Sequence, residues 1–325
     1  MMTRLSRHLV SVDSGLSIAG EGALSVAAEI YWPRDRDLSE PPVAFVCLPG
    51  GSMGRRYYDL RAEGDSSFSF AAAMAARGRV TISLDHLGIG DSSRPNDGFI
   101  LTPDLIAEAN ANATDRIVTG LKARTLAPEL PALPGLRTIG VGHSMGGMLI
   151  TLQQALSRQH LGLALLGFSS NGLVSYLPEP AHRLIGRPEA VSGEIAAIAR
   201  EIYAEPTYTV PPSPQGSAMF YGSRADRAGV EALKQVRDVQ LAIGGLQSMI
   251  PGSIRPAQDR IDVPVFLGLG DADIAGPPHA IPASFPASND VTLLVLPETG
   301  HCHFIFPSRQ KLFDRMADWA DLIVS

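Results

Sequence analysis

Segments that are apolar at every position alternate along this chain with segments of helical pattern, and this alternation restricts the fold more than any other feature. A strand that is apolar throughout is buried on both faces of its sheet, and helices between such strands provide the crossovers of a parallel sheet. The sequence therefore predicts an α/β fold with a mostly parallel central sheet flanked by helices. The apolar segments are 43–49, 79–85, 136–142, 161–168, 263–270 and 291–297.

The alternation stops between residues 171 and 260, where the pattern is helical and irregular and no strand is evident. We interpret residues 171–260 as a helical cap, or lid, inserted into a core formed by residues 1–170 and 261–325. Segment 206–217 is rich in proline and small polar residues. Such residues are typical of loops, so we expect a flexible part of the cap there.

Charge and composition exclude several classes of protein. The net charge is −6 and no block of basic residues is present, so no nucleic-acid partner is expected. The apolar runs are too short to cross a bilayer, and the first residues lack the apolar core of a signal peptide, so no membrane partner is expected. Cys47 and Cys302 give no disulfide framework. We expect a cytoplasmic protein, and its oligomeric state stays unknown at this point.

One junction between a predicted strand and the next helix carries Gly-His-Ser-Met-Gly at 142–146. Where a strand turns sharply into a helix, a Cβ at Gly142 or Gly146 would collide with neighbouring elements. Such a turn projects Ser144 from the strand end, and the first N–H groups of the helix, including that of Met145, are free to stabilise a negative charge. The same pattern fits an incidental N-cap serine, but its place between strand and helix favours a nucleophile.

A serine hydroxyl needs a base, and the base needs a group that orients it. His301 follows the last predicted strand, and Asp271 and Asp273 follow the strand before it. Because the carboxyl ends of parallel strands share one edge of the sheet, we expect Ser144, an aspartate and His301 to meet there. From spacing alone, either aspartate could be the partner.

These motifs, in this order, resemble those of the α/β-hydrolase superfamily, and the resemblance covers nearly the whole chain except the cap. It implies the α/β-hydrolase fold and a catalytic triad of Ser144, Asp273 and His301, with Asp273 preferred over Asp271. The matching stretches are GHSMGG at the nucleophile, DHLGIGDSS after the fourth strand, GDAD at the acid and TGHCHF at the base.

The resemblance also implies a second N–H group for an oxyanion, in the loop after strand 43–49. The superfamily often has His-Gly there, and this chain has Pro49-Gly50-Gly51. By position we predict the N–H of Gly51 as the second donor beside that of Met145, with Ser52 as the alternative. Side chains that are aromatic or flexible and apolar are candidates for the substrate pocket, although each fits core packing equally well. They are Tyr57, Tyr58, Met219, Phe220, Tyr221 and Met249.

The sequence therefore predicts a serine hydrolase that cleaves a carboxylic ester, or a lactone or thioester, of a mostly apolar small molecule through an acyl-enzyme. Three alternatives stay open: a carbon–carbon bond hydrolase, an acyltransferase with the same triad, and a ligand-binding protein with a vestigial site. No metal-ligand spacing and no nucleotide-binding motif is evident, so no metal and no cofactor are expected. We interpret His143 as a wall residue beside the nucleophile, His303 as a residue that packs or caps nearby, and Cys302 as a packing residue.

Overall fold

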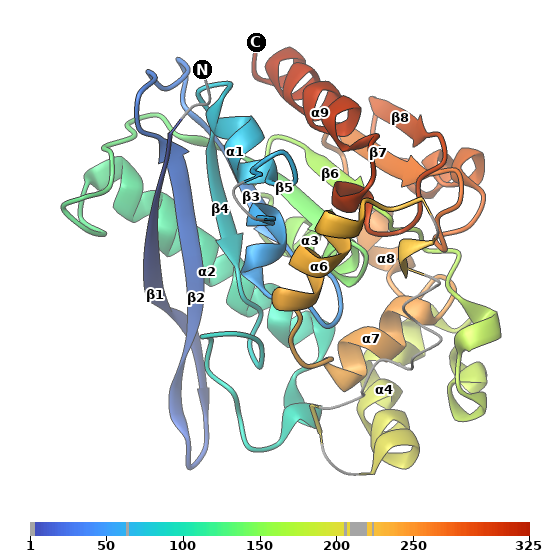
Figure 1. Cartoon of the computed structure of the whole chain (residues 1–325). Helices are drawn as coiled ribbons and strands as arrows, with labels where there is room; N and C mark the ends of the chain where they lie inside the picture. The colour runs from blue at the N-terminus through green and yellow to red at the C-terminus, as the bar shows by residue number, and fades with distance from the viewer. Residues whose placement is uncertain (1–3, 63–64, 205–206, 209–219, 223) are drawn as a thin grey trace.

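The computed structural model describes residues 4–62, 65–204, 207–208, 220–222 and 224–325, and the statements below concern these residues (Figure 1). Their strands form one eight-stranded sheet in the order β1-β2-β4-β3-β5-β6-β7-β8. The pairs β1·β2 and β2·β4 are antiparallel, and all other pairs are parallel. The strands are β1 (Leu5–Ile18), β2 (Gly22–Pro33), β3 (Val43–Leu48), β4 (Val80–Leu84), β5 (Arg137–His143), β6 (Leu163–Leu166), β7 (Val265–Gly270) and β8 (Val291–Leu296).

Helices cover both faces of this sheet, and β3 shows why its sequence is apolar throughout. Alternate side chains of a strand point to opposite faces. Ala44 and Val46 belong to the hydrophobic cluster that includes α2 (Pro103–Ala123) and α3 (Met145–Ser157). Phe45 belongs to a second cluster, which includes α1 (Phe70–Ala75) and α9 (Arg309–Val324). The predicted α/β fold, with a mostly parallel sheet flanked by helices, is confirmed.

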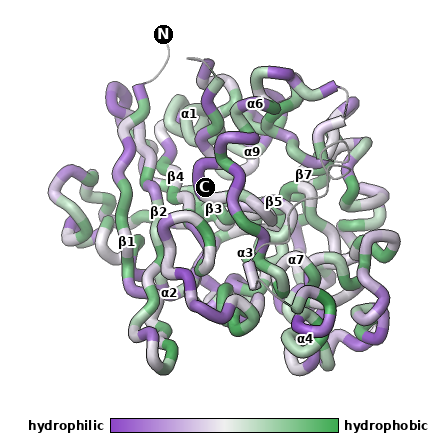
Figure 2. Tube along the Cα trace, turned by 60° about the horizontal axis from the view of Figure 1, so that its bottom comes forward, coloured by the Kyte–Doolittle hydropathy of each residue, from purple (hydrophilic) through white to green (hydrophobic). Residues whose placement is uncertain are grey.

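The described residues between β6 and β7 form helices and loops and contain no strand. A third hydrophobic cluster joins α4 and α7 with Phe99, which follows β4. Figure 2 shows hydrophobic and hydrophilic residues alternating around α4, which buries one face against α7. The elements of this segment are the 3-10 helices η3 (Val174–Tyr176) and η4 (Glu179–Leu184), and the helices α4 (Pro188–Tyr203), α6 (Arg227–Gln235), α7 (Ala242–Met249) and α8 (Arg255–Gln258).

Two sequence predictions fall largely beyond the residues that the structure describes. Of segment 206–217, expected to be a flexible part of the cap, only Thr207 and Tyr208 are described. Met219, a candidate pocket residue, also lies outside the described residues. In the part of the chain that is described, no helix is both long enough and apolar enough to cross a membrane.

Candidate active site

Ser144 occupies the sharp turn between β5 and α3, in a backbone conformation that L-residues rarely adopt. Its φ is 54° and its ψ is −122°. The turn is possible because its flanking residues lack side chains. A Cβ at Gly142 would overlap the carbonyl of Gly146, and a Cβ at Gly146 would overlap the carbonyl oxygen of Leu48 in β3. The turn therefore projects the serine hydroxyl from the carboxyl edge of the sheet, at the start of a helix whose first N–H groups lack partners within the helix.

His301 and Asp273 form a buried pair beside this turn. The Nδ1 atom of His301 lies 2.8 Å from Oδ1 of Asp273, and both side chains are almost completely buried. Because a carboxylate accepts, Nδ1 carries the hydrogen, and in a neutral imidazole Nε2 then presents its lone pair. Nε2 of His301 has no hydrogen-bond partner among the described residues. Ser144 and His301 line the same pocket.

The carboxylate of Asp273 accepts three hydrogen bonds. Oδ1 accepts from His301 and from the N–H of Ala275, and Oδ2 accepts from Nε2 of His303 at 2.8 Å. Burial alone would raise the pKa of this carboxyl. The electrostatic interaction and hydrogen bond with His301, together with the hydrogen bond of His303, outweigh burial and hold the pKa of Asp273 well below its usual value. Asp273 is therefore ionised, as an orienting acid requires.

Asp271 and His143 also lie near this pair, and each makes a hydrogen bond to the loop that carries His301. Asp271, the alternative acid, accepts the backbone N–H of Thr299 at 3.2 Å and so ties the acid loop to the histidine loop. His143 donates Nε2–H to the backbone carbonyl of His301 at 2.9 Å. Burial lowers the pKa of His143 well below its ordinary value, and the neighbouring His301 and His303 add to this effect. A neutral His143 therefore supports the loop that carries His301.

His303 is a site residue that the sequence analysis interpreted as packing or capping nearby. It is fully buried, but its ring donates directly to the acid of the site. The only sequence signal for this contact is its position two residues after His301, within TGHCHF. Cys302 between them is buried and unpaired. The described residues contain no group of three or more His, Cys, Asp or Glu side chains that could hold a metal ion.

The loop after β3 lies against the serine turn. A Cβ added at Gly50 would stand 3.1 Å from the Cβ of Ser144. This loop is held from the core: His86 donates Nε2–H to the carbonyl of Pro49 at 3.0 Å, and Tyr58 donates its hydroxyl to the carbonyl of Leu48 at 2.8 Å. The predicted N–H donor of Gly51 thus comes from a braced loop beside Ser144. The other predicted donor, that of Met145, comes from the first residue of α3.

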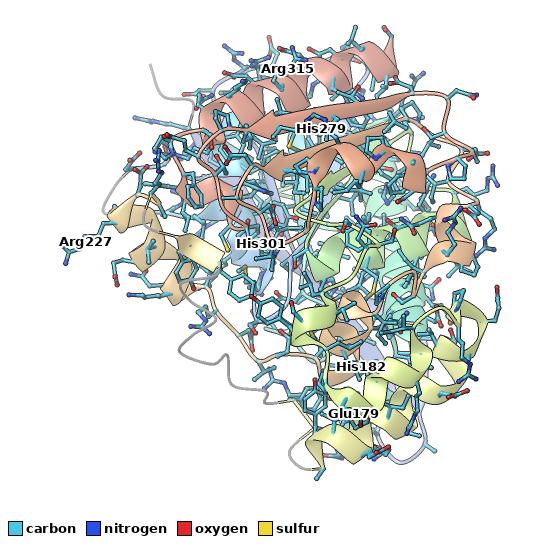
Figure 3. The ribbon with its side chains drawn as sticks, turned by 90° about the vertical axis from the view of Figure 1, so that its right-hand side faces the viewer. Glu179, His182, Arg227, His279, His301 and Arg315 are labelled. Carbon is cyan, nitrogen blue, oxygen red and sulfur yellow. The ribbon has the colours of Figure 1, made fainter. Side chains whose placement is uncertain are left out.

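The pocket at Ser144 is small, with a volume of about 30 Å³. His301 is buried and lies near the middle of the view in Figure 3, whereas Arg227 and Arg315 lie near the outline of the molecule. The pocket takes residues from the ends of β6 and β7, from the start of the β6–β7 segment and from α7. Its lining consists of Ser144, Gly167, Phe168, Ser169, Gly172, Leu173, Ser248, Ile274, Ala275 and His301.

The predicted pocket residues have different locations. The ring of Phe220 lies 5.4 Å from that of His301, so Phe220 is at the site. Tyr221 packs, partly buried, against the cluster that includes α9. Tyr57 does not line the pocket. It is fully buried and stacks on His143 at 4.8 Å, because an aromatic ring next to the loop after β3 finds more apolar surface beneath that loop than beside the serine. Tyr58 is likewise buried, and Met249 packs partly buried beside α4.

The sequence matches a family model described as the alpha/beta hydrolase family over residues 45–312. Similar solved structures include an esterase from Thermogutta terrifontis, 14% identical with a TM-score of 0.57, covering 98% of this chain and 100% of that chain. A bromoperoxidase from Bacillus anthracis is 12% identical with a TM-score of 0.59, covering 98% and 99%. A proline iminopeptidase from Mycobacterium smegmatis is 18% identical with a TM-score of 0.54, covering 98% of each chain. A comparison with curated proteins found no match.

Proposed function

The chain belongs to the alpha/beta hydrolase family, and on that basis we propose that it is a serine hydrolase that cleaves a carboxylic ester of a small molecule through an acyl-enzyme. One observation carries the proposal. Nδ1 of His301 is hydrogen-bonded to Asp273, its Nε2 has no partner among the described residues, and His301 and Ser144 line the same pocket. This is the arrangement that activates a hydroxyl for attack on an acyl carbon.

In the proposed reaction, the hydroxyl oxygen of Ser144 attacks the ester carbonyl carbon while Nε2 of His301 takes the hydroxyl proton. The carbonyl oxygen becomes an oxyanion, which accepts hydrogen bonds from the N–H groups of Met145 and Gly51. The intermediate collapses, the bond to the alkoxy group breaks, and the imidazolium of His301 gives its proton to the departing alcohol. Water then attacks the acyl-serine with His301 as base, which releases the acid and restores Ser144.

The ionised carboxylate of Asp273 has two functions in this cycle. It holds the Nδ1–H tautomer of His301 before attack, and it stabilises the imidazolium that forms during attack. Its low pKa supports both functions, because the carboxylate stays charged across the neutral pH range. His303 supports the same state by satisfying the oxygen that faces away from His301.

The pocket favours a small, uncharged group on the substrate. The volume of about 30 Å³ at the described lining residues supports a short group rather than a long one. Apart from His301, its described lining residues are apolar or carry neutral hydroxyls. We propose a short acyl or alkyl group as its occupant, a narrower choice than the mostly apolar substrate that the sequence suggests.

We also propose that residues 171–260 act as a cap over the site. Three described residues of this segment support the proposal, since Gly172, Leu173 and Ser248 line the pocket. Phe220 beside His301 supports it further. A cover of this kind excludes water and strengthens the hydrogen bonds to an oxyanion.

A fluorophosphonate probe, used alongside a series of aryl esters of increasing acyl length, tests the proposal. We expect labelling of the wild-type protein, fastest turnover for the shortest acyl groups, and loss of both in Ser144→Ala. Labelling without ester turnover would favour the carbon–carbon bond hydrolase or the acyltransferase. A wild-type protein that the probe does not label would contradict a reactive serine and favour a vestigial site.

A further inference from the structure

The chain between α6 and α7 runs along the loop that follows β3. We call residues 236–240 the strap. The N–H of Asp238 in the strap donates to the carbonyl of Ser52 at 2.9 Å, and the N–H of Gly54 donates to the carbonyl of Val236 at 3.3 Å. In Figure 1 this orange stretch passes close to the blue loop after β3. The strap therefore binds the loop that holds the predicted oxyanion donor, and it comes from the proposed cap.

At the end of the strap, the side chain of Gln240 occupies a slot between two glycines. A Cβ at Gly51 would overlap Oε1 of Gln240, and a Cβ at Gly245 in α7 would overlap Nε2. Any side chain at either glycine would expel the Gln240 amide. The close approach of this amide to Gly51 therefore depends on glycine at both positions, and the slot fits a planar amide.

The Gln240 amide contacts both parts of the proposed oxyanion hole. Its Oε1 accepts the hydroxyl of Ser52 at 2.9 Å. Its Nε2–H donates to the backbone carbonyl of Leu241 at 3.3 Å and lies 3.9 Å from the sulfur of Met145. One side chain thus contacts the loop after β3 and the first residue of α3. These are the two segments that supply the oxyanion donors.

Ser52 needs such support, because its φ is 59°, in the left-handed region that disfavours residues with a Cβ. A strained residue keeps this conformation only where surrounding contacts impose it. His86 and Tyr58 hold the loop at Pro49 and Leu48, before the glycines. After the glycines, the contacts to Ser52 come from the strap.

We propose that Gln240 is a positioning residue for the oxyanion hole. This inference rests on the proposed serine hydrolase function. Its amide sets the separation between the N–H of Gly51 and the N–H of Met145, so that both donors reach the same oxygen of a tetrahedral intermediate. The oxyanion hole is then complete only while the strap lies in place.

Gln240→Met tests this role, since methionine keeps the length of the side chain and removes both hydrogen bonds. Gln235→Met is the matched control, because Gln235 is exposed at the end of α6. We expect kcat for a short aryl ester to fall about 10- to 100-fold in Gln240→Met with KM unchanged, less than the loss of a whole donor. Inhibition by a trifluoromethyl ketone, which forms an oxyanion on the serine, should weaken by the same factor. Gln235→Met should match the wild type.

A double-mutant cycle with Ser52→Ala measures whether the two side chains act together. We expect the double variant to lose little more than Gln240→Met alone, because the hydrogen bond between them is already absent. If the fold-loss of kcat in the double variant equals the product of the losses in the two single variants, the two side chains act independently, which would contradict a shared role. A rise in KM with unchanged kcat would also overturn the proposal, because it would make Gln240 a direct substrate contact.

Hydrogen exchange provides a readout that does not depend on turnover. In Gln240→Met, we expect faster exchange in the peptide that contains Gly51 to Gly54 and no change in Gln235→Met. Unchanged exchange together with unchanged kcat would overturn the inference and leave the proposed function intact. A wild-type protein without probe labelling would overturn the proposed function instead, and exchange alone would then decide whether Gln240 holds the loop.

Discussion

His303 donates its Nε2–H to Asp273 at 2.8 Å, on the carboxylate oxygen that His301 does not use. A fully buried carboxylate needs a partner for each oxygen, because an unsatisfied buried charge is costly. Among the described residues, His303 is the partner of Oδ2. The acid is thus held between two histidines, one facing the serine and one facing the core.

The first prediction concerns this second histidine. His303→Leu should destabilise the protein by about 1–3 kcal/mol or more, since it strands a buried acceptor, and should lower kcat by disturbing Asp273. His303→Gln, which keeps an N–H donor, should recover part of both losses. Urea unfolding and ester kinetics measure the two effects. His279→Leu, at an exposed histidine, is the control and should change neither. Full activity of His303→Leu would show that its contact is only structural packing.

The second prediction separates the two aspartates of the acid loop. Asp273→Asn should lower kcat by about 10⁴-fold, because an amide favours the wrong tautomer of His301. Asp271→Asn should cost far less, because Asp271 only accepts the N–H of Thr299. Steady-state kinetics of both variants decides the matter. The reverse ranking would assign the acid to Asp271.

The third prediction compares two glycines in helices. Gly146→Ala should abolish activity and destabilise the protein strongly, because the new Cβ would overlap the carbonyl oxygen of Leu48 in β3. Gly193→Ala in α4 is the matched control. Nothing lies within 4 Å of its added Cβ, so alanine should stabilise the protein by about 0.5–1 kcal/mol through helix propensity. Thermal unfolding checks whether Gly146→Ala lowers the stability and Gly193→Ala raises it. Equal effects would contradict the crowding at the serine turn.

The fourth prediction concerns acid stability. Burial lowers the pKa of His160 from 6.5 to about 3. The folded protein thus keeps His160 neutral, while the unfolded chain takes up a proton below about pH 6.5. The contribution of His160 to the free energy of unfolding is therefore fully present above pH 6.5. It is lost as the pH falls toward 3, by up to about 1.4 kcal/mol per pH unit. His160→Gln should flatten this part of the curve in urea unfolding between pH 7 and 4. An unchanged slope would show that His160 does not titrate on unfolding.

The main parts of the fold, and the edge of the sheet where Ser144, an aspartate and His301 lie, could be predicted because they depend on regular patterns. The choice of Asp273 over Asp271 comes instead from the resemblance to the superfamily. β3 is apolar throughout since both of its faces pack against helices, and this pattern is visible without a structure. Ser144, Asp273 and His301 follow β5, β7 and β8, and parallel strands end at one edge whatever the loops do. Their proximity therefore needs only the topology of the sheet.

The remaining contacts depend on loop conformations that no periodicity encodes. Gln240 meets Ser52 across 188 positions of sequence, through a strap that forms a single β-bridge, from Arg237 to Met53, rather than a helix or strand. The ring of His303 reaches Asp273 only because the chain coils into a short 3-10 helix directly after Cys302. Tyr57 is predicted as a pocket residue but is buried in the core. An aromatic residue near a site can pack against either the core or the pocket. Its environment, not its type, determines which.

The order of the strands also has a consequence for biosynthesis. The segment with Ser144 and its turn is synthesised before β6, β7 and β8, whereas His301 comes from the loop after β8. Chains fold from the N-terminus as they emerge, so the serine turn is present long before its base. A translation product that stops short of β8 would carry Ser144 as an unassisted alcohol. The proposed chemistry thus requires that β8 and the loop after it have been synthesised.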